Sequence, residues 1–341
     1  MKQFLTSAAM SAAIALLSCS CDRTSPIQPE VPTDRAEVEI TIDGLDISAA
    51  TRAADLKPTP EESAYSSAMI LVYDKQSGVL ESYKPWTGGP VSFTLDKGEK
   101  VLYAVLNAGS DINTRAGSIS ALLSNTATLK GDLGGFFMMG KQQVTVSGKA
   151  SFSITVRRAA AKIVFNDVKL KLDSPALAAQ SFTVNAILVI NAAGDISYSA
   201  LDGGQSTYSP TVWYNRQKYV SGDCNRFLYV GGLSKRISNE NTIMLGKTLY
   251  TYPNYITSDS HASTWSPRKT RVCLECTIGS ETVYYPITLS EIGPNKLYTI
   301  NTLTITKKGV TNPDDEWDDA SASGAVIVDD WYAGLEITET M

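Results

Sequence analysis

The stretch Glu37-Val-Glu-Ile-Thr-Ile-Asp43 alternates polar and apolar residues without a break. Successive side chains of a β-strand point to opposite faces, so Val38, Ile40 and Ile42 share one face, and the polar residues share the other. The stretch therefore predicts a half-buried strand near the start of the folded region. It is followed by a loop over residues 46–63 that contains Ala, Thr and two prolines.

Short apolar or alternating runs separated by turns continue along the rest of the chain. This rhythm is typical of an antiparallel sandwich or barrel. Residues 118–123 predict one short helix capped by Ser118, and residues 202–265 predict long loops. The 341 residues suffice for about two domains. The predicted strands cover residues 69–73, 91–95, 101–106, 144–146 and 152–156, then 162–166, 168–172, 182–190, 271–278, 282–289, 297–306 and 325–328.

The N-terminus has the pattern of an export signal. Lys2 precedes an apolar run from Phe4 to Leu17 that is too short for a transmembrane helix. Leu-Leu-Ser before Cys19 is a lipobox, so residues 1–18 predict a lipoprotein signal peptide and Cys19 the lipidated residue. The alternative is an ordinary secretory signal that happens to contain Cys. Residues 19–36, rich in Ser, Pro, Thr and Asp, predict a tether.

The sequence offers little material for catalysis or for cofactors. Its one histidine, His261, cannot form a triad or a multi-His metal site alone, and there is no Gly-rich phosphate loop or GxSxG motif. The carboxylate run Asp314–Asp319 lacks the spacing of a calcium loop and predicts a solvated hairpin tip. A net charge of −5 with no basic face argues against nucleic acid. We expect no enzyme, no metal and no cofactor.

Three cysteines remain outside the anchor region, Cys224, Cys273 and Cys276. The last two form a CxxC within a predicted strand, where residues three apart point to opposite faces. We interpret them as structural, and the sequence leaves open whether any of the three pair.

Four features together resemble the fimbrillin family, the type V pilins of Gram-negative anaerobes. They are the lipobox at Cys19, the alternating strand leading to Thr51-Arg-Ala-Ala54, the segment Arg157-Arg-Ala-Ala-Ala-Lys-Ile-Val164, and Leu297–Gly309 leading to Trp331. The resemblance implies an all-β chain of two transthyretin-like antiparallel β-sandwich domains in tandem, residues 37–157 and 158–341, with minor helix. It implies a major fimbrial subunit-like lipoprotein of the cell outer membrane and surface, which polymerises with other fimbrial subunits and supports adhesion.

The resemblance also implies how assembly proceeds. A trypsin-like protease would cut between Arg52 and Ala53, and the strand with Val38, Ile40 and Ile42 would leave. A strand from another subunit would then fill the vacated groove.

The donor residues would be Trp331, Ala333, Leu335 and Ile337, which alternate with polar or small residues as the released strand does. A patterned C-terminus favours a stalk subunit over a tip adhesin. Alternatively, residues 331–341 form an edge strand of their own domain.

Other functions stay open from the sequence, namely an anchor or tip fimbrial subunit, or a monomeric surface lipoprotein that binds glycans. Aromatic residues in the predicted loops can stack on sugars, which is the basis of the glycan-binding alternative, but we interpret them as packing and loop support. The sequence names no receptor or glycan. These residues are Trp213, Tyr214, Tyr219, Tyr250, Tyr252, Tyr255 and Trp265.

Overall fold

The chain divides into two units, Met1–Asp34 and Arg35–Met341, and all helices and strands described below lie in the second. The computed structural model describes residues 34–44, 58–131, 133–203, 208–223, 225–259, 262–316, 322–323 and 326–331. No helix in these ranges is both long and apolar enough to span a membrane.

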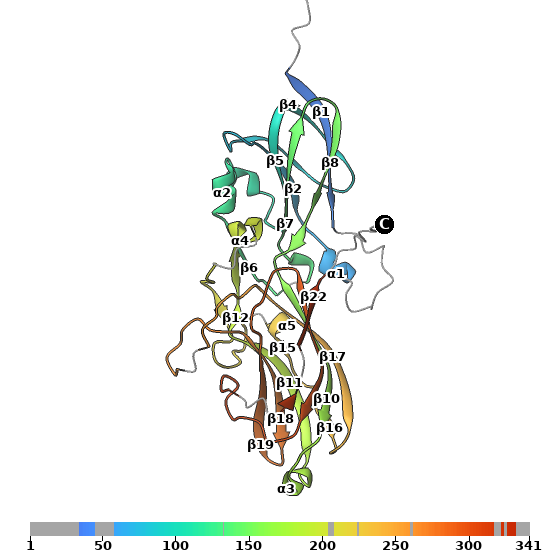
Figure 1. Ribbon diagram of the computed structural model, residues 1–341, viewed down its shortest axis with the longest axis vertical. Coiled ribbons are helices and arrows are strands. Elements are labelled where there is room, and N and C mark those ends of the chain that lie inside the picture. Colours follow the sequence, from blue (N-terminus) through green and yellow to red (C-terminus); the bar gives the residue numbers. More distant parts are fainter. Residues whose placement is uncertain are drawn as a thin grey trace, which may run out of the picture. The chain divides into compact units, whose positions relative to one another are not determined.

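Residues 35–158 supply two sheets (Figure 1). A small sheet has the strand order β4-β1-β8, and a larger one the order β3-β2-β5-β7-β9. The strands are β1 (Arg35–Asp43), β2 (Ala68–Asp74), β3 (Leu80–Pro85), β4 (Val91–Asp96), β5 (Gly98–Leu106), β7 (Met138–Val146), β8 (Ala150–Thr155) and β9 (Arg157–Arg158).

Residues 161–330 supply two more sheets. In one, β10 lies between β17 and β20, runs parallel to β20, and β20 also pairs with β21 and β22. The other has the order β15-β11-β18-β19, with β16 also paired to β11. The strands are β10 (Ala161–Leu170), β11 (Phe182–Ile190), β15 (Tyr229–Val230), β16 (Lys235–Ile237), β17 (Thr242–Thr251), β18 (Arg271–Ile278), β19 (Glu281–Thr288), β20 (Lys296–Ile305), β21 (Ala322–Ser323) and β22 (Val326–Asp330).

Two short strand pairs and several short helices complete the fold. The pair β6–β13 joins the two halves of the chain. Ser118 accepts a hydrogen bond from the Ala121 amide at 3.2 Å, which confirms the predicted capped helix, α2. The elements are β6 (Thr126–Thr128), β12 (Ala192–Ala193), β13 (Asp195–Ser197), β14 (Trp213–Tyr214), α1 (Pro60–Ser63), α2 (Ile119–Leu123), α3 (Pro175–Ala178), α4 (Tyr198–Gly203), α5 (Asn225–Leu228), and the 3₁₀ helices η2 (Ile112–Arg115) and η3 (Leu133–Gly135).

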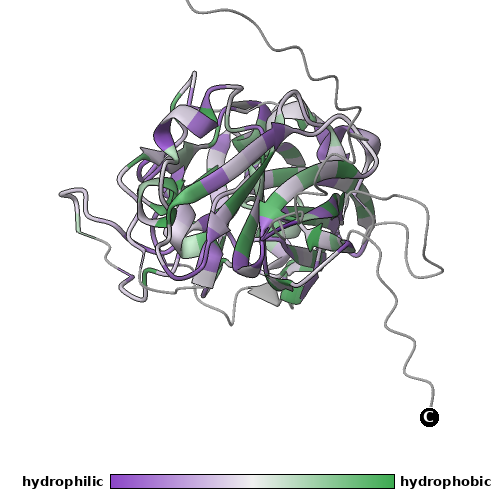
Figure 2. Cartoon of the chain, turned by 90° about the horizontal axis from the view of Figure 1, so that it is seen from above, coloured by the Kyte–Doolittle hydropathy of each residue, from purple (hydrophilic) through white to green (hydrophobic). Residues whose placement is uncertain are grey.

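The predicted all-β class is confirmed. Each half of the chain holds two sheets, in keeping with two sandwiches, while the boundary at residues 157 and 158 stays a prediction. Polar and apolar residues interleave along the strands (Figure 2), and one apolar core cluster draws residues from both halves.

The prediction of long loops over residues 202–265 is wrong for β17, a ten-residue strand. Gly246 lies in this strand at φ +55°, where the pairing with β10 shifts register. The bulge breaks the period of two, so the sequence pattern conceals the strand.

Candidate strand-exchange site

Strand β1 occupies the middle of its sheet and turns its apolar face inward. Val38, Ile40 and Ile42 are at most 5% exposed, whereas Glu37 and Glu39 between them are exposed. The predicted half-buried strand is thus confirmed. At roughly 1.5–3 kcal/mol for each large apolar side chain, the three together contribute about 5–9 kcal/mol of gross burial.

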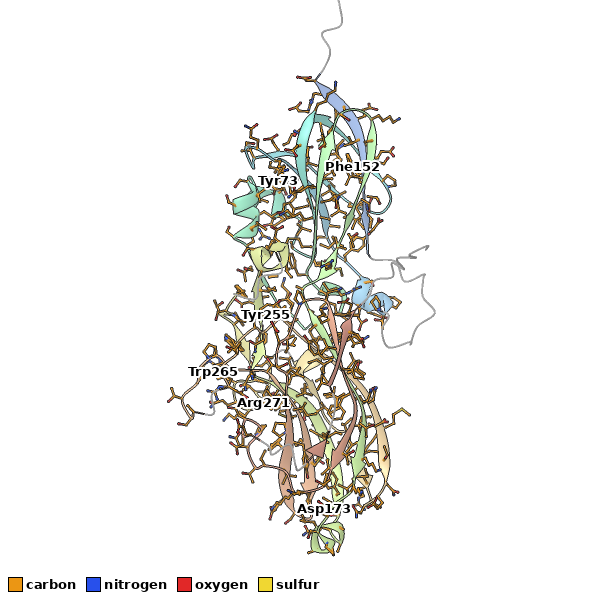
Figure 3. The ribbon with its side chains drawn as sticks, viewed as in Figure 1. Tyr73, Phe152, Asp173, Tyr255, Trp265 and Arg271 are labelled. Atoms are coloured by element: carbon orange, nitrogen blue, oxygen red, sulfur yellow. The ribbon has the colours of Figure 1, made fainter. Side chains whose placement is uncertain are left out.

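The two neighbours of β1 run in opposite directions. β4 pairs antiparallel, with Val38 opposite Phe93, and β8 pairs parallel, with Ile40 opposite Phe152, which is marked in Figure 3. Within the described ranges, β4 and β8 have β1 as their one strand partner. Withdrawal of β1 would therefore leave two unpaired strand edges along an apolar slot.

Polar contacts fix both ends of β1 but add little energy. At the start, Arg35 forms an ion pair with Asp96 at 3.0 Å, and both side chains are more than half exposed. Such exposed pairs contribute about 0–1 kcal/mol. At the end, the Ser153 hydroxyl donates to the Asp43 carboxylate. The apolar face of β1, rather than this ion pair and hydrogen bond, holds the strand in place.

Gly44 follows β1 where the chain leaves the sheet. Its φ is +91°, and a Cβ atom here would lie 2.8 Å from the Val156 carbonyl oxygen. Only glycine fits this combination of backbone angle and close approach. The position at which β1 ends is therefore sharply defined.

Several residues predicted for the site lie outside the described ranges. They are Cys19, Arg52, Ala53, Ala333, Leu335 and Ile337.

Trp331 is described, and its position differs from the one expected of a donor residue. Its side chain is fully buried within its own chain. It follows β22, which pairs antiparallel with β20, and its amide donates to the Asn295 carbonyl at 2.9 Å. Its ring packs against Phe136 and Tyr250. Trp331 thus belongs to the core of this chain, because aromatic partners and a backbone bond hold it there.

A buried ionic cluster beneath Trp331 was not predicted. Glu62 of α1 is fully buried; its carboxylate lies 3.1 Å from Lys162 Nζ and accepts a bond from the Tyr250 hydroxyl. Arg158 donates from Nε to the Glu62 carbonyl at 2.8 Å. Burial lowers the pKa of Arg158 to about 10, against the opposing effect of Glu62.

A sequence signal for part of this cluster exists. Thr59 and Glu62 form a reciprocal capping box, with Pro60 at the first helical position. That spacing identifies the helix start. It gives no sign that Glu62 is buried, because the partners come from distant segments.

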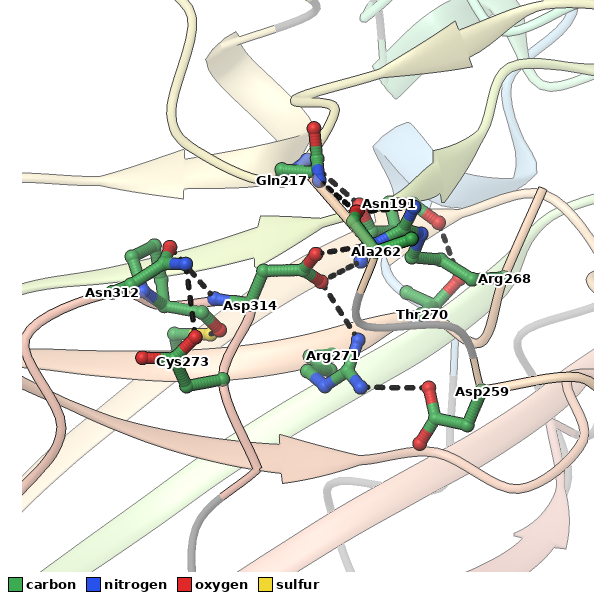
Figure 4. A network of polar contacts seen from close by, with 12 residues as sticks. Asn191, Gln217, Asp259, Ala262, Arg268, Thr270, Arg271, Cys273, Asn312 and Asp314 are labelled. Atoms are coloured by element: carbon green, nitrogen blue, oxygen red, sulfur yellow. Dashed lines mark hydrogen bonds and ion pairs between the residues drawn. The ribbon is translucent and has the colours of Figure 1, made fainter. Parts of the chain in front are cut away.

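A second buried network corrects the interpretation of the carboxylate run. Asp314 is 3% exposed and binds Arg268 and Arg271 at 2.7 and 2.8 Å (Figure 4). Asn191 also donates to it at 2.7 Å, and Arg271 reaches Asp259. The prediction of a solvated tip is wrong for Asp314, because two buried cations require its charge. Its neighbours Asp315 and Glu316 are exposed, as predicted.

The two cysteines of the CxxC lie on opposite faces of β18, as predicted. Cys276 is part of the main core, whereas Cys273 packs with Leu188 and Ile190 in a separate small cluster. Both are free thiols with no exposed surface, and burial raises the pKa of each. Such thiols are unreactive. Cys224 lies outside the described residues.

Most aromatic residues considered for glycan stacking have packing roles. Trp213, Tyr250 and Tyr252 are buried. Trp265, marked in Figure 3, has the Arg216 and Arg268 guanidinium carbons 5.4 and 5.1 Å from its ring centroid. Sugar rings stack on free aromatic faces, so this arrangement speaks against glycan binding here. Among the described residues, no group of three or more His, Cys, Asp or Glu has the arrangement of a metal site.

Comparison with known proteins gives similarity at the level of fold. No family model matches the sequence, and no curated protein matches it. Among solved structures, a fimbrilin from Porphyromonas gingivalis W83 is 17% identical with a TM-score of 0.58, covering 87% of this chain and 98% of that one. A candidate cell adhesion protein from Parabacteroides distasonis ATCC 8503 is 12% identical with a TM-score of 0.61, covering 89% and 99%. A tip fimbrial protein from Porphyromonas gingivalis with a C-terminal truncation is 14% identical with a TM-score of 0.52, covering 87% and 100%. The fold implied by the fimbrillin resemblance is confirmed.

Proposed function

We propose that this protein is a structural subunit of a cell-surface fimbria of a Gram-negative bacterium and acts in adhesion rather than catalysis. It is exported as a lipoprotein through Cys19 and reaches the outer membrane. A trypsin-like protease cuts after Arg52, β1 leaves, and subunits polymerise by strand exchange. The shared fold with fimbrial proteins supports the general role.

The pairing of β1 supports the strand-exchange part of the proposal. β1 is the first strand of the described chain, and it alone pairs with both β4 and β8 there. A terminal strand can leave without threading the rest of the chain. An open slot with two unpaired edges then accepts an extended segment by strand addition.

The sequence around Arg52 suits a single cut. Arg52 is the sole basic residue between Arg35 and Lys57, and Lys57 precedes Pro58, a bond that trypsin-like enzymes cleave poorly. The cut would fall between Gly44, where β1 has ended, and Pro60, where α1 begins. β1 would then be joined to the body only by non-covalent contacts.

The proposed donor begins after Trp331, because that side chain is held in its own core. Ala333, Leu335 and Ile337 keep the spacing of Val38, Ile40 and Ile42. Leu335 and Ile337 would contribute about 3–6 kcal/mol of gross burial, and backbone hydrogen bonds along both slot edges would add to this. A C-terminal donor fits a stalk subunit.

Limited proteolysis of the full-length chain in detergent tests the proposal. Low-dose trypsin should give a body that begins at Ala53, and this body should form polymers visible by electron microscopy. Arg52→Ala should remain intact at the same dose and stay monomeric. A first cut at the exposed Arg216, or polymerisation of the uncut Arg52→Ala chain, would refute the proposal.

A further inference from the structure

The cluster beneath Trp331 lies between the two chain segments that assembly uses. α1 follows the proposed cut site, and Trp331 precedes the proposed donor. Arg158 and Lys162 come from the junction between the two halves of the chain. The cluster therefore brings together segments that are far apart in sequence.

The contacts of α1 within the cluster are independent of β1. The Glu62 carboxylate contacts the Thr59 amide at 2.7 Å, Lys162 at 3.1 Å and the Tyr250 hydroxyl. Arg158 adds a bond from Nη2 to the Ser63 hydroxyl at 2.8 Å. None of these partners belongs to β1, so loss of β1 would leave each contact in place.

The two buried cations of the cluster require the negative charge of Glu62. Arg158 and Lys162 are 1% and 5% exposed. The Glu62 carboxylate forms an ion pair with Lys162, and its charge also favours the cationic form of Arg158, which donates to the Glu62 backbone carbonyl. The Trp331 ring lies 4.8 Å from Arg158 Cζ and 5.7 Å from Lys162 Nζ, where its negative face stabilises the cations further. Removal of one partner from a buried ion pair leaves an unpaired charge, which is strongly destabilising.

We propose that Glu62, Arg158, Lys162, Tyr250 and Trp331 form a clamp that retains the chain from Thr59 onward when β1 leaves. The clamp sets the N-terminal limit of strand release. This proposal rests on the proposed function, because it assumes that the protease cuts after Arg52. Arg158 and Lys162 also lie over the Trp331 ring. The clamp therefore also fixes the residue after which the proposed donor segment begins.

Trimming of the cut chain measures the limit of release directly. Full-length protein is cut with trypsin and then treated with proteinase K, and the new N-terminus of the body is read by mass spectrometry. In the wild type, trimming should stop before Thr59. In Glu62→Gln it should continue past Ser63. Glu61→Gln, an exposed carboxylate on the same helix, should behave like the wild type. A Glu62→Gln body that still stops before Thr59 would overturn the proposal.

Hydrogen exchange separates a local clamp from general instability. The amides of Ser63, Ala64 and Ser66 donate to Thr59, Glu61 and Asn107 respectively, and report on α1. In Glu62→Gln their exchange should be at least tenfold faster, with β5 unchanged. The same increase in exchange rate is expected in the uncut chain. The clamp can therefore be tested even if the protease does not cut after Arg52. If β10 also exchanges faster, Glu62→Gln with Lys162→Met should restore β10 and leave α1 fast. Persistent fast exchange in β10, or restored protection of α1, would overturn the proposal.

Discussion

The indole ring of Trp331 lies over the guanidinium of Arg158, with 4.8 Å between the ring centroid and Cζ. Trp331 is the last described residue, and its side chain is fully buried. Trp331 is therefore held in the core of its own chain, and any contact with another subunit would have to be made by residues after Trp331.

Two truncations should separate this anchor from the donor. A chain ending at Trp331 keeps the buried ring, so its urea midpoint should match the full-length chain, yet its cut form should not polymerise. A chain ending at Asp330 loses the ring and should lose about 3–5 kcal/mol of stability, as for removal of other large aromatic side chains. Equal stability of the two truncations would contradict the buried position of Trp331. Polymerisation of the chain ending at Trp331 would rule out the donor segment.

Thiol labelling should distinguish the buried cysteines in the native state. Cys273 and Cys276 have no exposed surface, and burial raises the pKa of both thiols, so the reactive thiolate is scarce. We expect neither to react with iodoacetamide at pH 8 in the folded chain, and both to react in 8 M urea. Peptide mass spectrometry reads each site separately. Labelling in the folded chain, or a disulfide between the two, would contradict the structure.

Glu275 should make the protein less stable as pH rises. It lies opposite Tyr284 across β18 and β19, and burial raises its pKa above the ordinary 4.5, although a bond from Tyr284 opposes this. The folded state then binds the proton more tightly than the unfolded state. The stabilising contribution of protonated Glu275 to the free energy of unfolding is present below pH 4.5, and it is lost as the pH rises through the pKa of Glu275 in the folded state.

Glu275→Gln keeps an acceptor for the Tyr284 hydroxyl but does not titrate. Its melting temperature relative to the wild type should therefore increase between pH 4 and pH 7.5. Glu281→Gln, at an exposed position of β19, is the control and should show a smaller change. A difference between Glu275→Gln and the wild type that is constant with pH would show that burial does not perturb this carboxyl group.

Asp314→Asn should destabilise the half of the chain that contains β18. The change leaves Arg268 and Arg271, both fully buried, without the carboxylate they share. Breaking a buried ion pair in this way costs about 3–5 kcal/mol. Asp315→Asn, its exposed neighbour, should cost little. Urea unfolding compares the two variants, and similar midpoints would mean that the network contributes nothing to stability.

The sequence could predict elements whose pattern is local. The alternation at Glu37–Asp43 identifies β1 and its buried face because a period of two suffices. It does not identify β4 and β8 as partners, or their opposite directions, since pairing joins segments that are distant along the chain. β17 escaped prediction because the bulge at Gly246 interrupts its period.

The same limit applies to buried charges. Glu62 and Asp314 each stand in a polar, acidic stretch that looks solvated. Their burial depends on cations contributed from elsewhere, Arg158 and Lys162 for one and Arg268 and Arg271 for the other. No local pattern contains that information.

Ile40→Ala tests whether β1 departs after cutting. Ile40 is fully buried between β4 and β8, so in the uncut chain its truncation should cost about 2–5 kcal/mol. If β1 has left the cut body, residue 40 is no longer part of the folded structure, and the variant and wild-type bodies should unfold at the same urea concentration. Leu102→Ala in β5, also fully buried, should destabilise cut and uncut chains alike. An Ile40→Ala penalty of equal size in both forms would show that β1 stays in its slot after cleavage, and strand exchange at this site would then be excluded.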